Sequence, residues 1–283
     1  MADQNPDSDR RTVLITGSAS GIGKEAALTL HKRGWRVFAS VRNPADIPTM
    51  MALGLEAVHL DLADSRSIDC AVDWLLQRTN GTLYALFNNG AYAQPGAVED
   101  IPRNALRAQF ETNLFGTHEL TTRLLPAMIA AGEGRIVQNS SVLGFVALKY
   151  RGAYVSSKYA LEGLSDALRL ELRGTGVHLS LIEPGPIRTG FRQRAREAYQ
   201  RNIVPVLSRH REAYATLEHR LNNEEFESRY TLGPEAVVSS LIHALESDAP
   251  KIRYHVTTPT RIFSVMKRLF PQSMLDNLLA KVQ

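Results

Sequence analysis

The sequence predicts an α/β protein in which a doubly wound parallel sheet carries helices on both faces. Two observations predict this fold. Short apolar runs rich in β-branched residues alternate with stretches of helical spacing along most of the 283 residues. Three glycines, Gly17, Gly21 and Gly23, follow the first apolar run, where a strand turns directly into a helix. Such alternation joins strands through helical crossovers, which makes the sheet parallel and of the Rossmann type.

The first unit establishes the pattern for the rest of the chain. Residues 12–16 (TVLIT) form a short apolar run, as expected of a buried strand. Residues 21–31 carry alanine and leucine at helical spacing, and residues 36–41 form the next strand. The alternation continues with strands predicted at 55–60, 83–87, 135–139 and 177–182, and helices at 65–77, 104–131 and 153–173.

The chain changes character after Pro186. Residues 191–230 are rich in Arg, Glu, Tyr and Asn and have weak helical periodicity. A segment of this length between sheet elements indicates a functional lid or, as the alternative, a partly disordered segment. A helix at 234–245 and a last strand at 252–257 follow. The amphipathic, basic stretch 262–279 indicates a helical region that packs on the core, with weak contact to a membrane surface or a dimer partner as the alternative.

The domain organisation follows from length and pattern. Residues 1–10 are predicted to be a flexible tail. Residues 11–283 are predicted to form a single Rossmann-fold domain with a lid at 191–230 and C-terminal helices at 258–283, because α/β folds of this length routinely form one unit.

Composition excludes several classes of protein. Hydrophobic residues make up 44% and charged residues 22% of the chain, a normal globular balance that excludes a disordered or fibrous protein. Lys and Arg (33) barely exceed Asp and Glu (29), so charge does not indicate a nucleic-acid partner. Cys70 is the single cysteine, which excludes an intramolecular disulfide and a cysteine-built zinc site, and no metal site is predicted.

The same features lead to an expected location. The polar N-terminal residues lack the basic start and apolar run of a signal peptide. No run of about 18 apolar residues occurs, so no membrane span is predicted. A single cysteine fits a reducing compartment, and we expect a cytoplasmic protein.

The turn after the first strand indicates a dinucleotide site. It reads Thr-Gly-Ser-Ala-Ser-Gly-Ile-Gly over residues 16–23. Gly17 permits a sharp turn, while Gly21 and Gly23 let the backbone approach a pyrophosphate at the helix N-terminus. Glycines at a tight strand–helix turn can also be purely structural. Their place at the first strand–helix turn favours the dinucleotide.

Two side chains bear on which dinucleotide binds. The second strand ends at Arg42 with no carboxylate, and a guanidinium there can hold the 2′-phosphate of NADP, so we predict NADP(H) as preferred cofactor, with NAD as the alternative. Arg42 could instead be an ordinary surface arginine. Asp61 ends the third strand and could accept from the adenine amino group or cap the helix that follows.

A tyrosine and a lysine supply candidate proton chemistry. Tyr154 and Lys158 share one helix face, and an adjacent ammonium or an oxidised nicotinamide would lower the phenol pKa from about 10. Ser141 follows a strand end and could hold the substrate oxygen, with Ser140 as its rival. Asn113 could hold, through its side chain or backbone, a water that connects Lys158 to solvent.

Together these motifs resemble the short-chain dehydrogenase/reductase family over about residues 11–190. The resemblance implies a catalytic set of Asn113, Ser141, Tyr154 and Lys158. It implies the following cofactor-binding residues: Gly17, Ser18, Ser20, Gly21, Ile22, Gly23, Arg42, Asp61, Leu62, Asn88, Gly90, Tyr154, Lys158, Pro184, Gly185, Ile187 and Thr189. The family also implies a homodimer or homotetramer built on the helices at 104–131 and 153–173. The tail motifs Gly233-Pro234-Glu235 and Lys267-Arg268-Leu269 resemble bacterial members described as NADP-dependent aldehyde reductases, and more distantly retinol and hydroxysteroid dehydrogenases.

One motif departs from the family pattern. The family reads Asn-Asn-Ala-Gly after the fourth strand, whereas this chain reads Asn88-Asn89-Gly90-Ala91. The swap places a Cβ where the backbone approaches the nicotinamide ribose. We expect cofactor binding to survive with a shifted loop.

The residues around the catalytic set indicate an apolar substrate. Residues 142–148 lead directly to Tyr154, and Phe191, Tyr199 and the run 203–207 could close over the site. This lining favours an apolar aldehyde, ketone or alcohol. The alternatives are a non-catalytic sensor of the dinucleotide and another reaction, epimerisation or dehydration, on the same scaffold.

Overall fold

The computed structural model describes residues 11–223 and 228–282, so the predicted tail at 1–10 lies outside the described residues. Seven parallel strands form one sheet in the order β3-β2-β1-β4-β5-β6-β7, and each predicted strand is present. The strands are β1 (Thr12–Ile15), β2 (Arg36–Val41), β3 (Glu56–His59), β4 (Ala85–Asn88), β5 (Gly134–Asn139), β6 (Val177–Glu183) and β7 (Arg253–His255).

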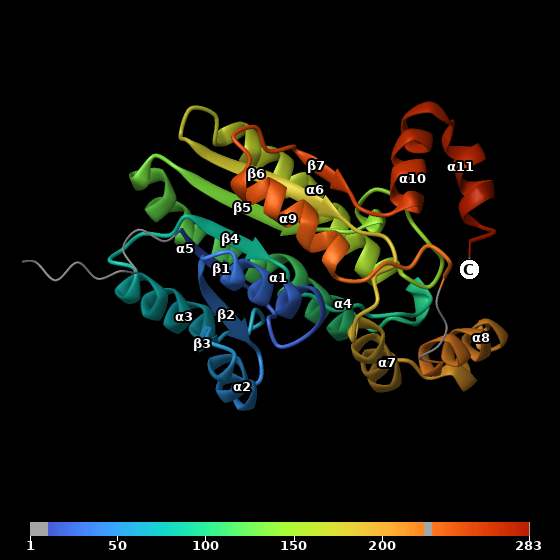
Figure 1. Cartoon of the computed structure of the whole chain (residues 1–283). Helices are drawn as coiled ribbons and strands as arrows, with labels where there is room; N and C mark the ends of the chain where they lie inside the picture. The colour runs from blue at the N-terminus through green and yellow to red at the C-terminus, as the bar shows by residue number, and fades with distance from the viewer. Residues whose placement is uncertain (1–10, 224–227, 283) are drawn as a thin grey trace, which may run out of the picture.

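Helices cover both faces of this sheet and extend past one end of it (Figure 1). The helices are α1 (Gly21–Lys32), α2 (Ile47–Ala52), α3 (Ser65–Arg78), α4 (Arg103–Phe110), α5 (Gly116–Ala131), α6 (Gly152–Glu171), α7 (Phe191–Asn202), α8 (Arg211–Asn222), α9 (Glu235–Glu246), α10 (Thr258–Leu269) and α11 (Gln272–Leu279). Helices α7, α8, α10 and α11 lie beyond the end toward which the strand arrows point (Figure 1).

Two hydrophobic clusters form because alternate residues of each strand point to opposite faces. On β1, Val13 and Ile15 join the cluster that packs under α1 and α9, whereas Leu14 joins the cluster under α3 and α5. Both faces are therefore buried, which explains why the strands read as continuous apolar runs rather than as alternating ones.

The stretch 104–131 is helical, as predicted, but is not one regular α-helix. Helices α4 and α5 are joined by a π-helical segment, Glu111–Phe115, that contains Asn113. Such segments occur frequently at functional sites because the extra residue redirects the backbone groups around it. The C-terminal stretch 262–279 is likewise divided, since Pro271 precedes α11.

A third cluster lies beyond the carboxyl ends of the strands. It includes side chains of α7, α8 and α11 together with Tyr154, and Tyr214 of α8 is fully buried within it. The Tyr214 hydroxyl accepts a hydrogen bond from the Ala97 backbone N–H at 2.9 Å. Helices α7 and α8, which belong to the segment predicted as a lid, thus pack on the same cluster as the candidate catalytic tyrosine.

The prediction that the whole run 203–207 closes over the site is wrong in part. Ile203 is buried, but Val206 and Leu207 are 78% and 84% exposed. The reason is the short 3₁₀ turn Pro205–Leu207, which directs the second half of the run 203–207 away from the cluster.

The C-terminal helix α10 has two apolar sides. Phe263 and Met266 pack against the third cluster, while Ile262, Val265 and Leu269 are exposed. Among the residues that the structure describes, no helix has both the length and the apolar character needed to cross a membrane.

Gly116 and Gly163 give a matched test of helix packing. A Cβ at Gly116 would lie 1.7 Å from the Leu62 carbonyl oxygen, whereas a Cβ at Gly163 meets nothing within 4 Å. We expect Gly116→Ala to reduce the free energy of unfolding by roughly 3 kcal/mol. Gly163→Ala, inside α6, should increase it by about 0.5–1 kcal/mol. Urea unfolding of both variants measures this, and a stable Gly116→Ala protein would contradict the close packing.

Candidate active site

The carboxyl ends of four adjacent strands bring the predicted residues to one edge of the sheet. Strands β1, β4, β5 and β6 are neighbours in the sheet and are parallel. Gly17, Asn88, Ser141 and Pro184 therefore follow or end strands at the same edge. This is the edge at which open parallel sheets bind ligands.

The turn after β1 is built around close backbone contact. Gly17 has φ +69°, and a Cβ at Gly23 would lie 2.3 Å from the Gly17 carbonyl oxygen. Only glycine fits at both positions, because the N-terminus of α1 packs directly on the turn. Gly21 lies against Thr189, where an added Cβ would be 3.0 Å from the Thr189 Cβ, and Ile22 packs against the core.

Ser18 and Ser20 have different surroundings in this turn. The Ser18 hydroxyl is fully buried and donates to the Ile15 carbonyl at 2.9 Å, while the Ser18 N–H donates to the Ser40 carbonyl at 2.8 Å. Ser18 thus ties the turn to β2. Ser20 precedes α1, and its hydroxyl accepts from Arg194 at 3.0 Å rather than capping the helix.

The loop after β4 is tied to the same turn. The Gly90 N–H donates to the Thr16 hydroxyl at 2.8 Å, and the Asn89 amide donates to the Thr16 carbonyl at 2.9 Å. Asn88 is buried and donates to the Thr121 hydroxyl of α5 at 2.9 Å. An added Cβ at Gly17 would lie 3.0 Å from the Gly90 Cα, so the glycine of the unusual Gly90-Ala91 order sits where the two loops touch.

Tyr154, Ser141 and Lys158 lie together at the edge. Tyr154 and Lys158 are 8% and 3% exposed, and the Lys158 Nζ is 5.8 Å from the centroid of the Tyr154 ring. Ser141, and not Ser140, is the serine close enough to Tyr154 to lower its pKa. The Ser141 hydroxyl oxygen also accepts from the Leu143 N–H at 3.1 Å.

The pKa of Tyr154 is raised, whereas the sequence led us to expect that it would be lowered. Burial raises the pKa of Tyr154 to about 12, outweighing the effect of Ser141 and the positive charge of Arg151, which both lower it. The expected lowering by Lys158 is absent because the Lys158 amine is turned toward the Asn139 carbonyl, which it contacts at 2.7 Å. Tyr154 in this structure is a neutral phenol at neutral pH.

Arg151 is a cation near Tyr154 that does not belong to the sequence motifs of the predicted site. It precedes α6 and lies three residues before Tyr154, so the spacing alone could have indicated it. The pKa of Lys158 is lower than that of an exposed lysine. Burial lowers it to about 8, and the negative charge of Glu162 partly offsets this shift.

The Asn113 side chain is already occupied. Its oxygen accepts from the Tyr92 N–H at 3.1 Å, and its nitrogen donates to the Tyr92 carbonyl at 2.9 Å and to the Ser157 hydroxyl at 3.2 Å. Asn113 therefore links the π-helical segment, the loop after β4 and α6. The sequence suggested that either the side chain or the backbone of Asn113 could hold a water. Because the side chain makes these three bonds, the backbone carbonyl is the better candidate.

The predicted adenine-side residues lie at the ends of β2 and β3. Arg42 is exposed just past β2. Asp61 accepts from the Ala63 N–H at 2.9 Å and closes a local turn, while the cap of α3 is Asp64. Leu62 is buried, with its carbonyl against Gly116.

The segment after β6 closes the edge. The Pro184 carbonyl accepts from the Val142 N–H at 2.8 Å, and an added Cβ at Gly185 would lie 2.2 Å from the Thr257 hydroxyl oxygen. Ile187 pairs in a bridge with Leu232, and the Thr189 hydroxyl accepts from the Phe191 N–H at 3.3 Å.

An apolar cluster borders Tyr154 on its outer side. The Phe191 ring meets the Tyr154 ring edge-on at 5.6 Å between centroids. Leu143, Val146, Tyr199 and Ile203 are buried in the same cluster. This side of the site is therefore suited to an apolar group rather than a charged one.

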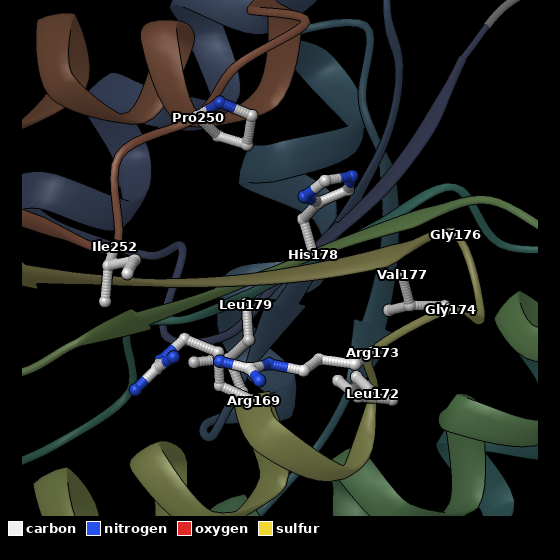
Figure 2. A pocket seen from close by; sticks show the side chains of 10 residues that line it. All are labelled: Arg169, Leu172, Arg173, Gly174, Gly176, Val177, His178, Leu179, Pro250 and Ile252. Carbon is white, nitrogen blue, oxygen red and sulfur yellow. The ribbon is translucent and has the colours of Figure 1, made fainter.

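A separate pocket of about 350 Å³ lies at the other end of β6 (Figure 2). It is lined by Arg169, Leu172, Arg173, Gly174, Gly176, Val177, His178, Leu179, Pro250 and Ile252. Gly176 and Val177 stand at the start of β6, whereas the predicted site residues follow strand ends. The pocket is therefore distinct from the candidate active site.

Comparison with known proteins identifies the family of this chain. A model of the short chain dehydrogenase family matches residues 11–200. The chain belongs to the short-chain dehydrogenase/reductase family. It is therefore an oxidoreductase of a family that acts on CH–OH and carbonyl groups, and the resemblance noted in the sequence is confirmed.

Individual relatives cover nearly the whole chain. A protein named uncharacterized oxidoreductase YbbO of Escherichia coli strain K12 is 44% identical over 95% of this chain and 94% of its own. An NADPH-dependent 3-dehydrocapnine reductase of Ornithobacterium rhinotracheale is 32% identical over 96% of each. The crystal structure of a short-chain dehydrogenase from Streptomyces avermitilis has a TM-score of 0.76 and 26% identity over 95% of this chain and 94% of that one.

The shifted pKa of Lys158 is open to direct measurement. We expect the Lys158 amine to titrate near pH 8, because its burial disfavours the charged form. Lysine side-chain ¹³Cε NMR should show one resonance with this midpoint, and Lys158→Arg should remove that resonance. If all lysine resonances titrate above pH 10, the buried placement of this amine is wrong.

Proposed function

We propose that the protein transfers hydride between NADP(H) and an apolar aldehyde, ketone or alcohol, with Tyr154 as the general acid and base. The observation that carries this proposal is a buried, neutral phenol that lies near Ser141 and Lys158, at the sheet edge beside the glycine turn. A phenol with its pKa raised to about 12 retains its proton at neutral pH, so Tyr154 is in the protonated form that reduction of a carbonyl requires.

The turn after β1 fits a dinucleotide. Gly23 packs against the Gly17 backbone at the N-terminus of α1, and the Ser20 side chain makes no cap bond to the N–H groups of this helix. Such a helix end suits a pyrophosphate, and the exposed Arg42 suits a 2′-phosphate. The bound nicotinamide would supply or accept the hydride.

Other side chains of the site would orient the substrate and supply the proton. The Ser141 oxygen accepts from Leu143, so its own hydrogen can be donated to the substrate oxygen while Tyr154 donates the proton. The Lys158 amine, held by the Asn139 carbonyl, lies where it can pass a replacement proton toward Tyr154. We assign to the Asn113 backbone carbonyl the water that connects Lys158 to solvent.

The surroundings support the choice of substrate and cofactor. The cluster of Phe191, Leu143 and Val146 presents apolar surface beside Tyr154. A relative that is 32% identical over nearly its whole length is named as an NADPH-dependent reductase. Both facts favour reduction of an apolar carbonyl with NADPH, with NAD as the alternative cofactor.

A homodimer or homotetramer is part of the same proposal. Phe115, Ile129, Leu164 and Leu170 are large apolar side chains that remain exposed on the π-helical segment, α5 and α6. These are the helices on which the family resemblance places subunit contacts, and buried contacts there would remove this apolar surface from water.

Tyr154→Phe tests the proton donor. We expect kcat for reduction of long-chain or aromatic aldehydes to fall by roughly 10³-fold, since a positioned general acid contributes this much. The Kd for NADPH should stay within about twofold, because the ring and its packing are retained. NADPH absorbance and fluorescence measure the two quantities.

Tyr159→Phe, on the exposed side of α6, is the matched control and should keep full turnover. Substantial turnover by the Tyr154 variant would refute the assigned role. Tight NADPH binding by the wild type without turnover on any aldehyde, ketone or alcohol would favour a dinucleotide sensor or another reaction on this scaffold.

Arg42→Ala tests the cofactor preference. Removal of the guanidinium should raise KM for NADPH at least about tenfold more than KM for NADH, because a charge-assisted contact to the 2′-phosphate is lost only with NADPH. Steady-state kinetics with both cofactors give the ratio. Equal changes in the two KM values would contradict the preference for NADP.

A further inference from the structure

A second arginine reaches the cofactor end of the sheet from a distant part of the chain. Arg194 lies on α7, within the segment predicted as a lid, and its Nη2 donates to the Ser20 hydroxyl at 3.0 Å. Ser20 is the residue that precedes α1, so this contact joins the lid helix to the glycine turn. Arg194 belongs to the arginine-rich segment 191–230, and the structure shows it half-buried.

Arg194 has charged neighbours of both signs, and Arg42 is the cation among them. Burial and the charge of Arg42 both lower the pKa of Arg194, and the carboxylates of Glu197 and Asp46 offset this only partly. Within residues 11–223 and 228–282, neither Arg194 nor Arg42 forms an ion pair with a carboxylate. Two guanidinium groups that share a site without an ion-paired acid are suited to an anion with more than one charge.

The position of Arg42 indicates which anion fits. Strand β2 is tied to the glycine turn where the Ser18 N–H meets the Ser40 carbonyl, and Arg42 follows two residues later. The end of this strand is where a dinucleotide site distinguishes a ribose 2′-hydroxyl from a 2′-phosphate. A phosphate placed between Arg42 and Ser20 is therefore the 2′-phosphate rather than the pyrophosphate.

We propose that Arg194 is a second cationic ligand of the NADP(H) 2′-phosphate, paired with Arg42, so that this phosphate fastens α7 to the cofactor. The inference rests on the proposed function, because it requires a dinucleotide on the glycine turn. It adds a residue from the lid to the determinants of cofactor choice.

The same helix connects the phosphate with the substrate side. Phe191 at the start of α7 touches the Tyr154 ring, and Tyr199 on α7 is buried in the apolar cluster. A phosphate that holds Arg194 therefore also holds one wall of the substrate site. NADPH, but not NADH, provides this connection, so the apparent affinity for the carbonyl substrate depends on which cofactor is bound.

The experiment compares Arg194→Gln, Arg194→Lys and the control Arg196→Gln, an exposed arginine of the same helix. Calorimetry measures Kd for NADPH, NADH, 2′,5′-ADP and 5′-ADP with the full-length protein. We expect Arg194→Gln to reduce the preference for NADPH over NADH, and for 2′,5′-ADP over 5′-ADP, by about tenfold. Arg194→Lys should restore part of the preference, and Arg196→Gln should match the wild type.

Kinetics provide the second readout. In the wild type, KM for the aldehyde should be lower with NADPH than with NADH, and Arg194→Gln should bring the two values together. A purely structural role of Arg194 would weaken binding of all four ligands equally and would leave both preferences unchanged. That result, or no change in any Kd, would overturn the proposal.

The outcomes also separate this proposal from the function on which it rests. If the wild type binds NADPH and reduces aldehydes but Arg194→Gln keeps the wild-type preference, the Arg194 assignment alone fails. If the wild type binds NADPH without turnover, the Kd ratios still decide the role of Arg194 while the oxidoreductase proposal fails. If the wild type binds none of the dinucleotides, both proposals are overturned.

Discussion

Burial of two ionisable side chains on α6 is the constraint on which the site depends. Tyr154 and Lys158 occupy one face of a helix that packs against the carboxyl edge of the sheet, and both are shielded from water. Desolvation disfavours each charged form, so the phenol keeps its proton and the amine loses its proton more readily than usual. Burial therefore brings the pKa of Lys158 toward neutral pH, whereas it moves the pKa of Tyr154 further above neutral pH.

The rest of the edge serves to hold this pair in place. Asn113 connects the loop after β4 to α6 through Tyr92 and Ser157, and its position in a π-helical segment allows its amide to reach both. The Asn139 carbonyl fixes the Lys158 amine. These bonds keep the geometry rigid, because breaking one of them leaves a buried polar group without its partner.

Helix α7 of the predicted lid connects the substrate side of the site with the cofactor side. Helix α7 touches the candidate catalytic tyrosine through Phe191 and the glycine turn through Arg194. One element therefore borders both the substrate side and the cofactor side. The physical consequence is that binding free energy from one ligand can order the wall used by the other.

The strands, their order along the chain and the glycine turn were determined by the sequence itself, because apolar runs and glycine spacing are local properties. Local pattern also placed Tyr154 and Lys158 on one helix face. The tertiary structure alone decided that Arg194 meets Ser20, since 174 residues separate them. It also decided the direction of the Tyr154 pKa, because desolvation depends on what packs around a side chain and not on its neighbours in sequence.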